Sequence, residues 1–245
     1  MKRLFMFLLA LPLLVACSDR EPENSLDNYL MDIATIENPE EASSFFLTLD
    51  DSTRLWTIAS NLRYYRPKDG QRVIASYSII NEKPDSLNYN YDIRLNDVYE
   101  ILTKGIFNLT PETADSIGND YIFIEDIWIG SHFLNVEFIY PGNATKHFIN
   151  LVSDSTKTYN DNKVHLEFRH NANGDYPAYN RWGIVSFNLK SLEKPGQNSV
   201  DIVVHTNEFN SNGNDKYEFK YIYNSETQLT SKRVFNIHPN RAVIN

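Results

Sequence analysis

Cysteine and positive charge are both scarce in this sequence. Cys17 is the only cysteine among 245 residues, so no disulfide can form within the chain. Lys and Arg together number 23, against 32 Asp and Glu residues. Because Lys and Arg supply most of the non-specific affinity for phosphate backbones, this balance argues against a nucleic-acid partner.

The common catalytic motifs are also missing. The sequence contains no G-x-S-x-G, H-E-x-x-H, P-loop or dinucleotide fingerprint. The letters SLEK at 191–194 match S-x-x-K, but they lie beside Pro195 and Gly196 in an expected loop and lack the partner motifs. We therefore expect a protein that acts by binding or assembly, with no catalytic residues, and a hydrolase is the least favoured alternative.

The position of Cys17 predicts a lipid anchor. The first three residues, Met-Lys-Arg, precede an uncharged segment at 4–16, which is too short for a bilayer span of about 20 apolar residues. The letters LVAC at 14–17 resemble the bacterial lipobox, in which the cysteine receives a diacylglycerol before the chain is cleaved in front of it. We expect residues 1–16 to be a lipoprotein signal peptide and Cys17 to attach the protein to the outer membrane, facing the periplasm or the cell surface.

The residues that follow the anchor predict a tether. Removal of the signal peptide takes away Lys2 and Arg3, which leaves 21 basic and 32 acidic residues and a formal charge of −11. A chain of this charge is not drawn onto an anionic lipid surface. Residues 17–27 lack apolar periodicity and predict a lipidated flexible tether. With Cys17 acylated, no thiol remains for redox chemistry or thiolate metal binding.

Beyond residue 28 the dominant period is two, which is typical of half-buried strands. In KVHLEFRH, for example, Val164, Leu166 and Phe168 alternate with charged and His residues. Asn-, Asp- and Gly-rich turns predict hairpins at 49–53, 140–143, 171–175 and 210–215. The expected strands lie near 29–37, 44–50, 55–60, 71–80, 89–95, 121–129, 132–140, 146–152, 163–169, 183–189, 199–206 and 216–223.

The spacing of these strands predicts an all-β chain with two domains. LTPETADSIG at 109–118 is the best helix candidate, with Thr110 as the cap, Pro111 in the first turn and Gly118 at the end. We interpret this helix as the start of the second domain. Five strands in 28–108 fit an OB-like barrel, and seven strands in 109–245 fit a β-sandwich.

Several segments together resemble one known family. GQRVIASYSI, DVYEILTKGI, WIGSHFLNVEFIY, KHFINLV and RHNANGDYPAY followed by WGIVSFNL are similar, in this order, to the NigD-like lipoproteins of Gram-negative anaerobes. The resemblance covers nearly all of the mature chain, and the lipobox agrees with it. It implies an N-terminal OB-like domain, a C-terminal β-sandwich, and an envelope lipoprotein linked to bacteriocin production or immunity.

Candidate metal ligands are sparse in the sequence. The six histidines are each isolated, and a metal site would require them to assemble across strands, so we expect solvated side chains. Asn171, Asn173 and Asp175 alternate as in calcium loops, but position 182 holds Trp182 where a bidentate Glu is needed. We interpret this segment as an Asn-Gly turn, and we expect no metal and no cofactor.

Aromatic residues in the first domain raise the question of a ligand. An OB face can stack bases on aromatic rings, but the acidic charge and the export signal oppose a nucleic-acid ligand, and most of these rings are expected in the core. A protein or saccharide partner fits better, because aromatic rings contact sugars without positive charge. The alternative function is therefore an accessory saccharide-binding surface lipoprotein. The rings concerned are Trp56, Tyr64, Tyr65, Tyr77, Tyr89 and Tyr91.

One short segment, RYYR, is the predicted partner contact. It consists of Arg63, Tyr64, Tyr65 and Arg66. Adjacent tyrosines in an extended segment cannot both face the core, so at least one should be exposed. Tyr and Arg are the residue types over-represented in binding hot spots. We expect these four residues to contact the physiological partner, whose identity the sequence leaves open.

Overall fold

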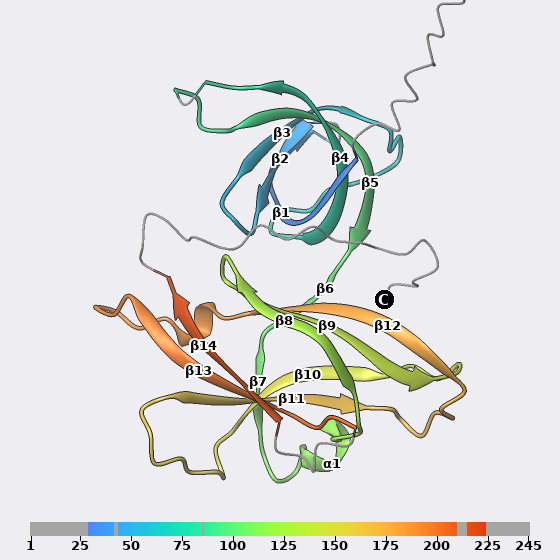
Figure 1. Ribbon diagram of the computed structural model, residues 1–245, viewed down its shortest axis with the longest axis vertical. Coiled ribbons are helices and arrows are strands. Elements are labelled where there is room, and N and C mark those ends of the chain that lie inside the picture. The colour runs from blue at the N-terminus through green and yellow to red at the C-terminus, as the bar shows by residue number, and fades with distance from the viewer. Residues whose placement is uncertain (1–28, 42–43, 85, 210–214, 224–245) are drawn as a thin grey trace, which may run out of the picture.

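The computed structural model describes residues 29–41, 44–84, 86–209 and 215–223. The predicted signal peptide and tether, with Cys17, lie outside the described residues. The fold is all-β, as predicted, with a barrel above a two-sheet sandwich in Figure 1. Within the described part of the chain, no helix has the length and hydrophobicity needed to cross a bilayer.

The N-terminal domain is a closed five-stranded barrel. Its strands are β1 (Leu30–Glu41), β2 (Ser44–Leu49), β3 (Arg54–Ser60), β4 (Arg72–Glu82) and β5 (Tyr91–Glu100), in the order β1-β2-β3-β5-β4, and β4 pairs with β1 to close it. Alternation in β2 sends Phe45, Leu47 and Leu49 inward. This barrel confirms the predicted OB-like domain, and the 49–53 hairpin is confirmed with Ser52 at φ 68°.

The C-terminal domain is the predicted β-sandwich. One sheet has the order β14-β13-β11-β10-β7, and the other has the order β6-β12-β9-β8. Leu134, Val136 and Phe138 from one sheet pack against Leu166 and Phe168 from the other in a common core. The elements are β6 (Leu102–Lys104), β7 (Ile106–Leu109), α1 (Ala114–Ile117), β8 (Phe123–Gly130), β9 (Phe133–Gly142), β10 (Phe148–Asp154), β11 (Val164–Asn171), β12 (Tyr179–Asn188), a 3-10 turn (Lys190–Leu192), β13 (Ser199–Thr206) and β14 (Asp215–Ile222).

Some local predictions differ from the structure. The helix expected over 109–118 is only a single turn, α1. The residue at its N-cap position is Thr113 and not the predicted Thr110. Residues 102–108, assigned from the sequence to the first domain, contain β6 and most of β7, and these strands pair with β12 and β10 of the sandwich. The chain therefore enters the second domain just after Ile101 and not at residue 109.

Two of the predicted hairpins are links between sheets. Residues 140–143 lie at the end of β9, and the next strand, β10, belongs to the opposite sheet. The turn at 171–175 has positive φ at Asn173 (52°) and Gly174 (70°), as its composition predicts, but it also leads from one sheet to the other. The turn expected at 210–215 lies almost entirely outside the described residues.

The barrel packs on the outer face of the four-stranded sheet. Ile33 and Ile74 of the barrel and Ile101 at the junction form one buried cluster with Trp182 and Ile184 of β12. Figure 1 shows β8, β9 and β12 between the barrel and the five-stranded sheet. The four-stranded sheet is therefore covered on both faces, whereas the five-stranded sheet turns its outer face away from the barrel.

A buried ion pair lies within this interface. Arg72 of β4 is fully buried, and its guanidinium bonds both carboxylate oxygens of Asp50 at 2.7 and 3.0 Å. The same guanidinium donates to Asn135 Oδ1 of β9 at 3.1 Å, and Ser186 of β12 donates to that oxygen at 2.7 Å. A charge buried at this depth requires such partners, so this network fixes how the two domains meet.

Candidate functional site

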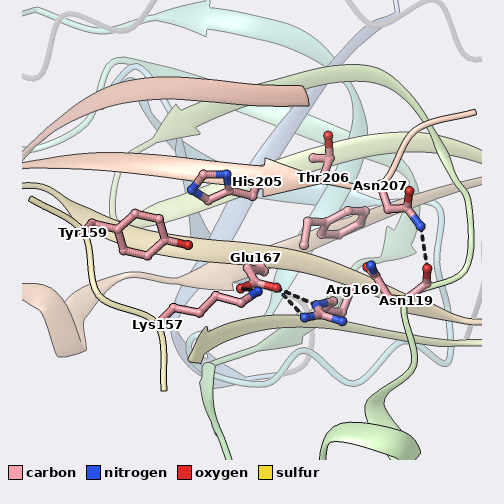
Figure 2. A pocket seen from close by; sticks show the side chains of 9 residues that line it. Asn119, Lys157, Tyr159, Glu167, Arg169, His205, Thr206 and Asn207 are labelled. Atoms are coloured by element: carbon pink, nitrogen blue, oxygen red, sulfur yellow. Dashed lines mark hydrogen bonds and ion pairs between the residues drawn. The ribbon is translucent and has the colours of Figure 1, made fainter. Parts of the chain in front are cut away.

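A polar pocket of about 170 Å³ lies on the outer face of the five-stranded sheet (Figure 2). Alternation along β11 sends Leu166 and Phe168 into the sandwich core and leaves Glu167 and Arg169 on the outer face. His205 lies beside them on β13, in register with Glu167. The full lining is Asn119, Lys157, Tyr159, Glu167, Phe168, Arg169, His205, Thr206 and Asn207.

The charged side chains of the pocket are paired with one another. Glu167 accepts from Lys157 Nζ at 2.5 Å through one oxygen, and from Arg169 Nε and Nη2 at 2.8 and 2.5 Å through the other. Lys157 also lies 3.6 Å from Asp154 Oδ2, and Arg169 Nη1 donates to the Gly118 carbonyl at 3.3 Å. Two cations and two carboxylates thus form a cluster without net charge, and each side chain is held in position.

Aromatic rings form one wall of the pocket. The connection between β10 and β11 places Tyr159 on His165, with ring centroids 3.5 Å apart and an interplanar angle of 3°. His165 Nδ1 lies 2.9 Å from His205 Nε2, and His165 Nε2 lies 2.9 Å from Asp161 Oδ1. Burial and the neighbouring imidazole lower the pKa of His205, and burial and Glu167 raise the pKa of Tyr159. At neutral pH the pocket therefore presents a neutral imidazole and a protonated phenol.

Several hydrogen-bonding groups of the pocket have no partner in the part of the chain that the structure describes. Asn207 Nδ2 donates to the Asn119 carbonyl at 2.6 Å, as Figure 2 shows, and this fixes the amide. Among the described residues, the Tyr159 hydroxyl, the Asn207 side-chain oxygen and the Asn119 side chain have no hydrogen-bond partner. An arrangement of fixed ions, unused polar groups and a flat ring can recognise a small polar ligand.

A second histidine pair is buried at one end of the same sheet. His147 Nδ1 lies 2.7 Å from His170 Nε2, His147 Nε2 lies 3.1 Å from Asp175 Oδ2, and His170 Nδ1 lies 3.0 Å from the Tyr121 carbonyl. The carbonyl and the carboxylate only accept, so His170 Nδ1 and His147 Nε2 are the donors in these two contacts. Burial lowers the pKa of His170, and the backbone N–H of Asn143 above all lowers the pKa of Asp175.

The histidines thus differ from the expectation of isolated, solvated side chains. Four of them form two pairs with short nitrogen–nitrogen contacts, and His147 and His170 are buried. Within the part of the chain that the structure describes, no group of three or more His, Cys, Asp or Glu side chains is arranged to hold a metal ion. The alternation in KVHLEFRH already placed His165, Glu167 and Arg169 on one face, but no local signal placed Lys157 and Tyr159 over that face.

The RYYR segment lies in the connection between β3 and β4. Tyr64 is 87% exposed, and Arg63 and Arg66 are exposed as well. Tyr65 is half-buried against the barrel core, with its ring centroid 6.4 Å from that of Phe45. One tyrosine of the pair is therefore available to a partner, and the contact itself remains a prediction.

The other aromatic residues of the barrel divide between core and surface. Tyr77 is buried in the core, and Tyr91 packs against it. Trp56 and Tyr89 are half-buried around Phe46, at centroid distances of 4.4 and 5.9 Å. Trp56 and Tyr89 therefore pack on the same ring, while Tyr77 and Tyr91 belong to the barrel core.

Two family models match the chain in consecutive segments. The NigD-like N-terminal OB domain matches residues 33–101, and the NigD-like C-terminal beta sandwich domain matches residues 105–221. These limits agree with the entry of the chain into the sandwich just after Ile101. No curated protein matches the sequence.

Solved structures of other bacterial proteins share the fold. A protein of unknown function from Bacteroides vulgatus is 29% identical, with a TM-score of 0.70 over 85% of this chain and 96% of that one. A protein from Parabacteroides distasonis, provisionally described as toxin-related, is 33% identical, with a TM-score of 0.67 over 80% and 95%. A NigD-like immunity protein from Bacteroides caccae is 18% identical, with a TM-score of 0.62 over 78% and 96%.

Proposed function

The chain belongs to the NigD-like family, and from this premise we propose that it is a lipid-anchored protein of the cell envelope that acts by binding a partner and not by catalysis. The observation that carries the binding function is the outer-face pocket. Its ions are paired with one another, and its unused groups are hydrogen-bonding side chains and a flat ring. The carboxylate of Glu167 is held by two cations, which suits a positioning role better than proton transfer.

The anchored state is supported by the sequence around Cys17. Each buried methylene of an acyl chain contributes roughly 0.8 kcal/mol, so the two or three chains of a bacterial lipoprotein hold firmly. The proposed site of this anchored protein is the outer membrane, facing the periplasm or the cell surface. The resemblance to NigD-like lipoproteins supports a bacteriocin-related partner, and RYYR is the proposed protein contact. The alternative is an accessory saccharide-binding lipoprotein, which the chemistry of the pocket favours.

Replacement of the anchor cysteine tests the envelope location. Cys17→Ala should leave a protein that stays in the aqueous phase of a detergent partition, because no thiol remains to carry the lipid. Ser18→Ala is the matched control, since it changes the neighbouring residue and keeps Cys17. Equal recovery of Cys17→Ala and the wild type in the detergent phase would contradict the anchor.

Affinity capture from intact envelopes tests the binding function. The lipidated wild-type protein is compared as bait with the double variant Tyr159→Ala, Asn207→Ala, which removes the ring and one amide of the pocket. A molecule that the wild type retains and the variant loses supports binding through the pocket. Identical recovery by both baits would exclude the pocket as the binding surface.

A further inference from the structure

We propose that the outer-face pocket binds one residue of an uncharged saccharide, which rests on the proposed binding function and names its ligand class. The groups that would make the contacts come from four separate segments. Asn119 precedes β8, Tyr159 lies between β10 and β11, Glu167 and Arg169 are on β11, and Asn207 follows β13. Figure 2 shows their side chains around the same space.

The charge of the pocket argues for an uncharged ligand. Lys157 and Arg169 are already paired with Glu167 and Asp154 at distances between 2.5 and 3.6 Å. An anion would have to compete with Glu167 for both cations, and a cation would have to compete with them for Glu167. A hydroxyl group can instead add to the cluster, because it donates to a carboxylate and accepts from an ammonium or guanidinium group at the same time.

The unused polar groups suit a molecule with many hydroxyls. The Tyr159 hydroxyl both donates and accepts, the Asn207 side-chain oxygen accepts, and the Asn119 amide does both. A sugar ring carries alternating hydroxyls that can satisfy such a mixture of donors and acceptors. A peptide side chain offers fewer polar atoms in the same volume, so the hydrogen-bonding pattern favours the saccharide.

The aromatic wall fits the flat, apolar face of a sugar ring. One face of Tyr159 lies on His165, and its centroid is 5.5 Å from that of His205, so the ring rests against two imidazoles that contact each other at 2.9 Å. Tyr159 remains 37% exposed. An immobilised ring with a polar tip presents apolar surface at low entropic cost, and the C–H groups of a sugar can pack on it.

The size of the pocket limits the ligand to one sugar residue. Its volume of about 170 Å³ is below the roughly 300–1,000 Å³ of pockets that enclose drug-sized ligands. Further residues of a glycan would lie outside, where Tyr121, Phe123 and Phe209 form an exposed aromatic group with centroid distances of 5.9 and 5.6 Å. Tyr121 and Phe209 each lie two residues beyond a pocket residue, Asn119 and Asn207. The surface beside the pocket thus offers a second contact for a longer chain.

A glycan array tests this inference directly. The lipidated protein, in a detergent without sugar headgroups, is applied to immobilised neutral and acidic bacterial and host glycans. We expect retention on neutral glycans that share one sugar residue, competed by that sugar as its free methyl glycoside. Tyr159→Phe and Asn207→Ala should each weaken binding roughly 2- to 12-fold, because each removes one hydrogen-bonding group. Tyr159→Ala should weaken it more, since the ring is also lost.

Tyr179→Ala is the matched control for these variants. Tyr179 is a 67% exposed tyrosine on β12 of the other sheet, so its loss should leave glycan binding unchanged. Retention of acidic glycans alone, or equal retention of the wild type and Tyr159→Ala, would overturn the inference. An array without any bound glycan would overturn it as well. In these cases the envelope capture separates the two proposals. If capture still differed between the wild type and the pocket variant, the binding function would stand and only the saccharide ligand would be wrong. If capture did not differ either, the pocket would have neither role.

Discussion

At the scale of single residues, Asp175 connects two loops at one end of the sandwich. Its carboxylate accepts the backbone N–H of Asn143 at 2.5 Å and that of Ala144 at 3.4 Å, and it lies 3.1 Å from His147 Nε2. The side chain is only 4% exposed. These contacts join the β9–β10 connection to the 171–175 turn. The sequence pattern around Asp175 is similar to that of a calcium loop, but in the structure its carboxylate accepts hydrogen bonds from the backbone and contacts His147.

Asp175→Asn should lower the midpoint of thermal unfolding at pH 7, because an amide places a donor against backbone donors and loses the charge beside His147. The pKa of Asp175 is lowered in the folded state, so its contribution is fully present above the unfolded pKa of about 3.9 and is lost as pH falls below that value. The difference between wild type and variant should therefore narrow below about pH 4. Melting curves from pH 7 to pH 2 measure this. Asp115→Asn changes an exposed carboxylate and serves as the control, and it should melt at the same temperature as the wild type at every pH. If the difference in melting temperature between the wild type and Asp175→Asn stayed constant with pH, the stabilising role of the ionised Asp175 carboxylate would be contradicted.

At the scale of elements, the connection between β3 and β4 places the two tyrosines of RYYR in different environments, with Tyr64 in solvent and Tyr65 against the barrel core. Tyr64→Ala removes an exposed ring and should change the free energy of unfolding by less than about 0.5 kcal/mol. Tyr65→Ala removes a ring that packs near Phe45 and a hydroxyl that donates to Gln71 at 3.3 Å, so it should cost about 1–3 kcal/mol. Urea unfolding measures both values.

The same variants test the predicted contact. If RYYR binds the partner, Tyr64→Ala should weaken the captured complex by at least about 1 kcal/mol while the fold keeps its stability. Unchanged affinity in this folded variant would remove the segment from the proposed interface.

Strands with a strong local pattern could be predicted from the sequence, and strands defined by their partners could not. The alternation in KVHLEFRH predicts β11 and its two faces, because side chains alternate along any strand. The strand β6 has only three residues and exists because it pairs in parallel with β12, about 80 residues later. No local pattern reports such a pairing. For the same reason Glu167 and Arg169 could be assigned to one face, whereas Lys157 and Tyr159, which come from a connection, could not be added to them.

At the scale of the whole molecule, the barrel is held by a filled interface and not across an open groove. Arg72 and Asp50 meet Asn135 at its centre, and Trp182 and Ile184 pack beside them. A Cβ added to Gly130 would lie 2.1 Å from Asp50 Oδ2, so even the backbone of β8 approaches this ion pair closely. The outer face that carries the pocket is the one that the barrel leaves open. Binding at the pocket can therefore proceed without separation of the two domains.

The boundary at Ile101 leads to a prediction about fragments of the chain. A fragment of residues 102–245 keeps β7, whose Leu109 is buried and whose Ile106 packs against the sandwich core, whereas a fragment of residues 119–245 loses both. At roughly 1.5–3 kcal/mol for each fully buried side chain, the longer fragment should be more stable by about 2–5 kcal/mol in urea unfolding.

The barrel provides the matched control. Fragments 28–101 and 28–108 should unfold at the same urea concentration, because residues 102–108 pair with no strand of the barrel. Both barrel fragments should be less stable than the barrel in the intact chain, since separation leaves the Arg72 and Asp50 pair without Asn135 and its apolar surroundings. Equal stability of the two sandwich fragments, or a gain on extending the barrel from 101 to 108, would place the boundary back at residue 109.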